Sequence, residues 1–168
     1  MAWIPVHAWK KVDVFAPVFE SLKQKKGLFD PMIALFTENP ELMGTDLNGR
    51  GDTIYHAFAI GVFGDGDECA MTLHAIHTMS GGNVNAQNNS GDTPLYVAVS
   101  RSNAIIVKTL LQCGADPTIT NKRGDTPDKA PMLGDRISSV LEKEYRKCLD
   151  ILKNPPQCFS TKSSNKLD

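Results

Sequence analysis

Apolar residues recur three and four positions apart in two neighbouring stretches near the middle of the chain. The apolar positions are Leu95, Ala98 and Val99 in the first stretch and Val107, Leu110 and Leu111 in the second. This spacing places the members of each set on one face of an α-helix. Gly114 follows the second set at the position where a helix C′ glycine is expected. The pattern therefore predicts two short helices joined by a turn.

Similar periodicity occurs towards both ends of the chain. Residues 12–26 are apolar-periodic and stop at Gly27, and Asp30-Pro31 can open a second helix that runs through Phe36. Near the C-terminus, a strongly amphipathic pattern predicts a helix that ends before Asn154. Its apolar face comprises Ile137, Val140, Leu141, Cys148, Leu149 and Leu152.

The triplet Gly-Asp-Thr occurs three times, at residues 51–53, 91–93 and 124–126. The threonines of the last two copies lie 33 residues apart, which is the period of a known solenoid repeat. The sequence around the first triplet, 46–59, aligns with 89–98 and more weakly with 122–130. The triplets therefore mark the same point in a repeated unit.

The residues of the second triplet have physical roles in such a unit. The hydroxyl of Thr93 can cap a helix N-terminus, and Pro94 suits the first helical position, where its missing N–H costs nothing. Gly91 and Gly124 suit a hairpin turn because glycine adopts positive φ without steric cost. Each unit is thus predicted to begin with a hairpin and continue into a capped helix.

Residues 46–130 resemble an ankyrin-repeat protein, in which a helix–turn–helix and a hairpin surround a Thr-Pro-Leu-His-x-Ala motif. The resemblance implies an all-α solenoid of helix–turn–helix units with hairpin loops. It also implies that the imidazole of His56, at the motif's histidine, ties Thr53 to a neighbouring turn. Tyr96 replaces this histidine in the next repeat, so the network is not uniform.

We predict one domain over residues 1–153, followed by a disordered tail at 154–168. Its units are an N-terminal capping unit (1–45), two repeats (46–87 and 88–121) and a C-terminal capping unit (122–153), in which Pro131 shortens the first helix. The first repeat is eight residues longer than the second between its threonine and its closing glycine. The glycines and acids of 61–68 predict a turn or short loop there.

Composition excludes several classes of function. The net charge is −1, from 18 basic and 19 acidic residues, so no basic excess favours nucleic acid. No apolar run approaches the length of a membrane helix, and the first residues do not resemble a signal peptide. The four cysteines form no C-x-x-C pair, which indicates free thiols in a reducing compartment. We therefore expect a cytoplasmic monomer without cofactors.

Candidate chemistry is sparse. His74 and His77 share one helical face near Cys69, which would suit a small metal- or thiol-dependent enzyme. The alternative is that both histidines are ordinary polar positions of a helix. Cys113 and His56 could suggest a nucleophile pair, but the family resemblance gives both a structural place, Cys113 before the closing glycine and His56 at the motif's histidine. Residues 65–68 resemble part of a calcium loop, although the D-x-D-x-D-G spacing is absent. No hydrolase, phosphate-loop or zinc-protease motif occurs, so we predict no enzyme activity.

The hairpin tips are the main candidate site. In a stack of similar units, the triplet aspartates would form a row with a spacing of about 8–10 Å, which we expect to recognise a partner with a basic patch. The predicted partner-binding residues are Arg50, Asp52, Asn89, Asp92, Arg101, Lys122, Arg123 and Asp125, with Arg101 on the concave side. The alternative is that the tips are solvated loops.

The sequence therefore predicts a module that docks a protein partner through its hairpin tips and concave helices. A second hypothesis is a secreted bacterial or viral effector that binds a host protein in the host cytosol. A third is the small enzyme described above. The fold alone does not name the partner.

Overall fold

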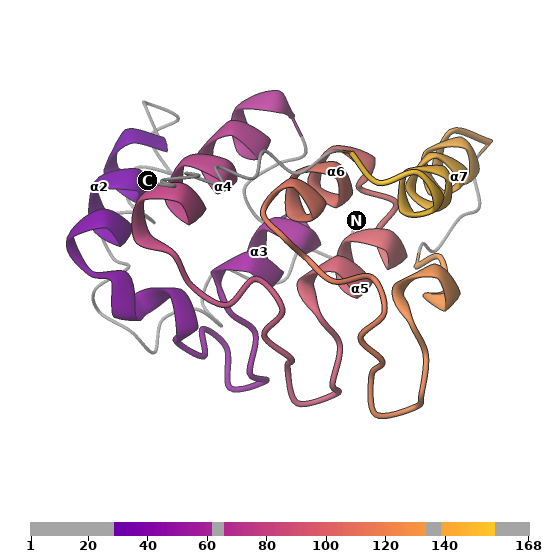
Figure 1. Cartoon of the computed structure of the whole chain (residues 1–168), viewed down its shortest axis with the longest axis horizontal. Coiled ribbons are helices and arrows are strands. Elements are labelled where there is room, and N and C mark those ends of the chain that lie inside the picture. The colour runs from indigo at the N-terminus through magenta and orange to yellow at the C-terminus, as the bar shows by residue number, and fades with distance from the viewer. Residues whose placement is uncertain (1–28, 62–65, 134–138, 157–168) are drawn as a thin grey trace, which may run out of the picture.

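A computed structural model describes residues 29–61, 66–133 and 139–156 (Figure 1). The described residues form helices and loops, with no strand among them. The α-helices are α2 (Phe29–Glu38), α3 (Ile54–Ile60), α4 (Asp67–Ser80), α5 (Pro94–Ser100), α6 (Ala104–Gln112) and α7 (Ser139–Lys153), and the 3₁₀ helices are η3 (Pro40–Gly44) and η4 (Pro127–Lys129). The predicted all-α class is confirmed. The helix expected over residues 12–26 lies outside the described residues.

The helices form two layers above a row of hairpins (Figure 1). In the outer layer α2 contacts α4, α4 contacts α6 and α6 contacts α7, while in the inner layer α3 contacts α5 and α5 contacts η4. The hairpins at 46–53, 88–93 and 121–126 project side by side from the inner layer. This is the expected solenoid of helix–turn–helix units.

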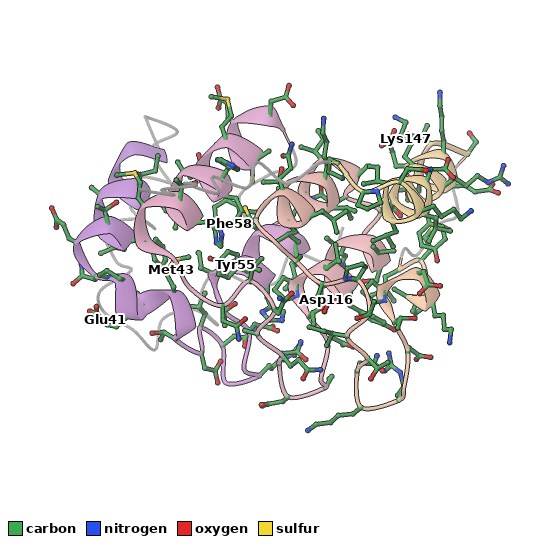
Figure 2. The ribbon with its side chains drawn as sticks, viewed as in Figure 1. Glu41, Met43, Tyr55, Phe58, Asp116 and Lys147 are labelled. Atoms are coloured by element: carbon green, nitrogen blue, oxygen red, sulfur yellow. The ribbon has the colours of Figure 1, made fainter. Side chains whose placement is uncertain are left out.

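The core lies between the two layers. Tyr55 and Phe58 of α3 are fully buried, as are Leu95 of α5 and Leu110 of α6. Figure 2 shows Tyr55 and Phe58 in the interior, whereas Glu41 and Lys147 point away from it. The short inner helices are buried on almost every face because the outer layer, the neighbouring inner helix and the hairpins enclose them. The buried residues form one continuous cluster, as expected when each repeat completes its neighbour's core.

The predicted helix start in the second repeat is confirmed. Thr93 is the N-cap of α5, and its Oγ accepts a hydrogen bond of 3.2 Å from the Tyr96 backbone N–H. Pro94 occupies the first helical position. Gly114, with φ of +87°, follows the end of α6. These local signals set the bounds of the repeat.

The extra length of the first repeat is only partly a loop. The connection from α3 to α4 spans 61–66, against 101–103 between α5 and α6, and residues 62–65 lie outside the described part of the chain. The remaining extra residues of the first repeat lengthen α4, which has 14 residues against 9 in α6. Asp67 and Glu68, predicted to lie in the loop, instead form the first turn of α4, where carboxylates interact favourably with the helix dipole.

The C-terminal unit covers the end of the stack. α7 packs on α6 and α5, with Cys148 fully buried, and the Tyr145 hydroxyl donates a hydrogen bond of 2.6 Å to the Ala130 carbonyl. The first helix of this unit is reduced to η4, as expected from Pro131. Val140, predicted on the buried face, is 67% exposed because it lies at the edge of the apolar stripe. Ile137 lies outside the described residues.

Ser102, between α5 and α6, combines two unfavourable features. Its φ is +57°, the left-handed region that favours glycine. It is 7% exposed, and its Oγ has no hydrogen-bond partner among the described residues. Left-handed backbone costs a non-glycine residue about 1–3 kcal/mol, and a buried hydroxyl without a partner adds to that cost.

We therefore expect Ser102→Gly to stabilise the protein by about 1–2 kcal/mol, because it relieves both features. Ser102→Ala removes only the hydroxyl and should gain less. Thermal unfolding followed by circular dichroism measures both changes. A lower melting temperature for Ser102→Gly than for the wild type would contradict this account.

Candidate functional site: the hairpin ladder

The second and third hairpins have the same internal geometry, whereas the first is closed from one residue earlier in the repeat. Each is closed by a backbone hydrogen bond that ends on the triplet aspartate: Leu47 N–H to Asp52 O, Asn88 N–H to Asp92 O and Asn121 N–H to Asp125 O, at 2.9–3.1 Å. The triplet glycines have φ between +76° and +82°. Only glycine adopts this conformation at little cost, which explains its recurrence at this position.

Backbone hydrogen bonds join each hairpin to the next. The Asn89 N–H donates to the Arg50 carbonyl at 2.8 Å, and the Lys122 N–H donates to the Ser90 carbonyl at 3.2 Å. The hairpins are so close that a Cβ at Gly91 would stand 2.7 Å from the Lys122 nitrogen. The glycines thus serve the close approach of hairpins as well as the turn.

Asparagine side chains repeat the same link. Asn88 Nδ2 donates to Asp52 Oδ1 of the preceding hairpin, and Asn121 Nδ2 donates to Asp92 Oδ1, both at 2.8 Å. The Oδ1 atoms of these asparagines accept backbone N–H groups within their own hairpins. We call this series of asparagines, triplet aspartates and backbone links the hairpin ladder.

The triplet aspartates do not form the exposed row that the sequence suggested. Asp52 is 5% exposed, and its carboxylate accepts from both Asn48 and Asn88. The side chain of Asp92 is 17% exposed, and that of Asp125 is 36% exposed. The expectation of three equivalent solvent-facing carboxylates was wrong, because neighbouring hairpins approach closely enough for asparagine to cover the first two.

Links between helix and hairpin add to the ladder. His56 Nδ1 accepts from the Thr53 N–H at 3.1 Å, and its Nε2 donates to the Asp92 carbonyl of the next hairpin at 3.0 Å. The role implied for His56 by the family resemblance is therefore confirmed. Tyr96 stands at the equivalent position, and its hydroxyl accepts from Arg123 Nη2 at 2.8 Å. Tyrosine replaces histidine here and still links its helix to the following hairpin.

Comparison with known proteins agrees with this architecture. The family described as ankyrin repeats (many copies) matches residues 80–127, which include the second and third hairpins. Residues 80–127 therefore contain ankyrin-repeat sequence. A Rickettsia bellii protein named as an ankyrin repeat protein is 42% identical over 72 residues, which cover 42% of this chain and 41% of that protein.

Two relatives from eukaryotes also match. Human NF-kappa-B inhibitor alpha is 35% identical over 83 residues, covering 48% of this chain and 25% of the inhibitor. The yeast regulatory protein SWI6 is 50% identical over 96 residues, covering 46% of this chain and 12% of SWI6. The chain thus spans less than half the length of these relatives. The similarity identifies ankyrin repeats and does not transfer the activity of a whole relative.

Asp52 offers a test of the structural role of the ladder. The Asp52 carboxylate accepts hydrogen bonds from the side-chain amides of Asn48 and Asn88, one on each oxygen. Asparagine at this position has the same shape but only one side-chain oxygen, so one of the two amides loses its acceptor. We expect Asp52→Asn to destabilise the protein by about 1–2 kcal/mol. The matched Asp125→Asn, at the end of the ladder, should change stability by less than about 0.5 kcal/mol. Urea unfolding measures both, and equal costs would contradict the ladder.

The buried His56 predicts a pH dependence. Burial lowers the pKa of His56 below its ordinary value of 6.5, and the Asp92 carbonyl and the charges of Asp52 and Asp92 oppose the shift only in part. The unfolded chain therefore binds a proton more readily than the folded chain. The stability contributed by neutral His56 is complete above about pH 6.5 and is lost as pH falls through the lower folded pKa.

We expect the melting temperature to fall between pH 7.5 and pH 5, and His56→Gln to reduce that fall. His74→Gln, which removes an exposed imidazole, is the control and should retain most of it. If His56→Gln and the wild type lose the same stability over this range, His56 is not the titrating group.

The remaining predicted partner-binding residues are exposed. Arg50, Asn89, Lys122 and Arg123 lie on the hairpins, and the first three are held in register by the backbone links. Arg123 also bonds Asp125 and Tyr96, so it belongs to the ladder as well as to the surface. Arg101 is the C-cap of α5, at the opposite end of a 7-residue helix from the hairpins, or about 10 Å away. The structure therefore does not place it at the tips.

The candidate metal site at Cys69, His74 and His77 does not assemble. Among the described residues, no group of three or more His, Cys, Asp or Glu side chains could hold a metal ion. The Nδ1 of His77 is 2.7 Å from the Tyr55 hydroxyl, which also donates to the Gly81 carbonyl at 2.9 Å. Cys69 is buried. His77 thus has a structural partner. None of the described helices combines the length and the hydrophobicity of a transmembrane segment.

Sequence reasoning missed the asparagines, although a signal was present. Asn48, Asn88 and Asn121 each stand four residues before a triplet aspartate. An interval repeated in all three copies indicates paired roles for the two residue types. Their hydrogen bonds across hairpins could not be inferred from the interval alone, because it does not say which hairpin an asparagine faces.

Proposed function

We propose that this chain is a binding module that docks a protein partner on the exposed side chains of its hairpin tips. The inner helices α3 and α5, which the sequence suggested as a second contact surface, have almost all of their side chains buried. Ankyrin repeats form extended surfaces that suit protein partners. The observation that carries the proposal is the ladder itself, because it fixes the spacing of Arg50, Asn89 and Lys122 while their ends remain exposed. A surface organised in advance loses little conformational entropy on binding.

The surface chemistry changes which residues we assign to the partner. Because Asp52 and Asp92 are engaged within the ladder, they position the hairpins and contribute little direct contact. Arg50 and Lys122 have no intramolecular side-chain partner among the described residues, so both can contact a partner. A basic partner patch would therefore face mainly Asp125, and we no longer assign it to a row of three aspartates.

The relatives support binding rather than catalysis as the class of function. The names of two relatives denote an inhibitor and a regulatory protein, and neither denotes an enzyme. The bacterial relative is the observation that keeps the effector hypothesis as an alternative. We also propose that the protein is cytoplasmic and monomeric. Cell fractionation measures its location, and sedimentation measures its oligomeric state.

Affinity capture with a matched pair of variants tests the proposal. The tip variant combines Arg50→Ala, Asn89→Ala and Lys122→Ala. The control variant, Lys108→Ala with Lys143→Ala, removes the same number of positive charges from α6 and α7. We expect the tip variant to fold normally and lose the captured partner, while the control retains it. If both retain the partner, the tips are solvated loops and the interface lies elsewhere.

A further inference from the structure

Two hydrogen bonds recur in both interfaces between neighbouring hairpins. In both copies the following hairpin donates a backbone N–H and a side-chain amide, from consecutive residues, to a carbonyl and a carboxylate of the preceding hairpin. The donors are Asn88 and Asn89 in one copy and Asn121 and Lys122 in the other. Each hairpin therefore has a donor side and an acceptor side.

The donor side of the first hairpin is closed within the chain. The Gly49 N–H, equivalent to the N–H of Asn89, donates to Asp46 Oδ1 at 2.8 Å. Asn48 Nδ2, equivalent to that of Asn88, donates to Asp52 Oδ2 of its own hairpin at 2.7 Å. Asp46 thus takes the place that a preceding hairpin would occupy.

The acceptor side of the third hairpin has no such closure among the described residues. Asp125 uses Oδ2 to accept from Arg123 at 3.2 Å, and its Oδ1 and the Arg123 carbonyl have no hydrogen-bond donor there. A Cβ built at Gly124 meets nothing within 4 Å, whereas those at Gly51 and Gly91 meet the next hairpin. The groups that join the first two pairs of hairpins are therefore accessible on the third.

A groove lies between α7 and residues that flank the third hairpin in the sequence. It is lined by Leu149, Leu152 and Lys153 of α7 together with Pro117 and Asp128. A partner segment that extends from the hairpin edge to this groove would bury apolar side chains against Leu149 and Leu152 while it donates hydrogen bonds. The combination resembles strand addition to a sheet edge, where main-chain bonds supply affinity and side-chain pockets supply specificity.

We propose that the third hairpin is a docking edge that a protein partner extends with a turn of its own, presenting a side-chain amide followed by a free backbone N–H. The inference rests on the proposed function and specifies one surface for it. The partner's asparagine donates to Asp125 Oδ1, the next N–H donates to the Arg123 carbonyl, and a close approach over Gly124 is required. A second copy of the chain fits poorly, because its first hairpin already uses both donors internally.

The test uses the full chain, labelled with ¹⁵N, and a cyclised peptide carrying residues 84–95 as the probe. This peptide contains the donor pair of the second hairpin. We expect chemical-shift changes at residues 121–126 and none at 46–49. The dissociation constant of the peptide should be about 1–10 mM. A peptide with Asn88→Ala should bind at least about threefold more weakly.

Variants of the protein complete the test. Asp125→Ala should weaken binding of the peptide at least about threefold. Asp150→Ala, which removes an exposed carboxylate from α7, should leave that binding unchanged. Absence of shifts at 121–126, or equal effects of the two variants, would overturn the proposal. Concentration-dependent dimerisation abolished by Asp125→Ala would also overturn it, because a second copy would then occupy the edge. The titration needs no cellular partner, so its failure leaves the capture experiment unaffected.

Discussion

Gly91→Ala is expected to destabilise the protein by about 2–4 kcal/mol. Gly91 has φ of +78°, and left-handed backbone alone costs alanine about 1–2 kcal/mol. In addition, the new methyl would stand 2.7 Å from the Lys122 nitrogen, which is backbone and cannot rotate away. The third hairpin must then move, weakening the Lys122–Ser90 and Asn121–Asp92 hydrogen bonds, each worth about 0.5–1.5 kcal/mol or more.

Gly124→Ala is the matched control. Gly124 belongs to the same triplet and has a similar φ of +82°, but a methyl there meets nothing within 4 Å. Its cost should therefore be that of the backbone alone, about 1–2 kcal/mol. Urea unfolding of both variants isolates the contribution of hairpin contact. Equal costs would show that the hairpins do not depend on close approach.

Removal of α7 is expected to have a still larger effect. A chain that ends at Leu133 loses the helix that covers α6 and α5, including the fully buried Cys148. Val107, Leu110 and Leu111 of α6 are now nearly inaccessible to water. Exposure of each such side chain costs about 1.5–3 kcal/mol. The total approaches the entire stability of a typical domain, about 5–15 kcal/mol, so cooperative unfolding should be lost.

The control is a chain that ends at Pro156 and therefore keeps α7. It should retain the unfolding transition of the full chain. Differential scanning calorimetry compares the two truncations. A chain ending at Leu133 that melts as cooperatively as the control, and at the same temperature, would show that α7 does not cap the repeats.

Much of the fold could be predicted because its signals are local. Thr93 and Pro94 specify a helix start through a hydroxyl acceptor and a fixed φ, and the glycines specify turns. The spacing of the apolar residues in 107–111 indicates correctly which face of α6 is buried. The family resemblance then supplied the stacking, which no single repeat encodes by itself.

The site was harder to predict because it depends on contacts between repeats. Periodicity showed that the triplet aspartates occupy equivalent positions, but it did not show whether they face solvent or the next hairpin. Asp52 is covered by Asn88, whereas Asp125 has no following hairpin among the described residues. Equivalent residues thus have different environments according to their place in the stack. Similarly, composition could not show that Asp67 and Glu68 would extend α4.

The most direct test of the account compares how two variants bind the captured partner. Equilibrium affinity is measured by interferometry at a temperature where both variants are folded. The account predicts that the tip variant, Arg50→Ala with Asn89→Ala and Lys122→Ala, binds at least about tenfold more weakly, a loss of about 1.4 kcal/mol. It predicts that Asp52→Asn binds like the wild type despite its lower stability. Wild-type affinity in the tip variant together with lost binding in Asp52→Asn would contradict it.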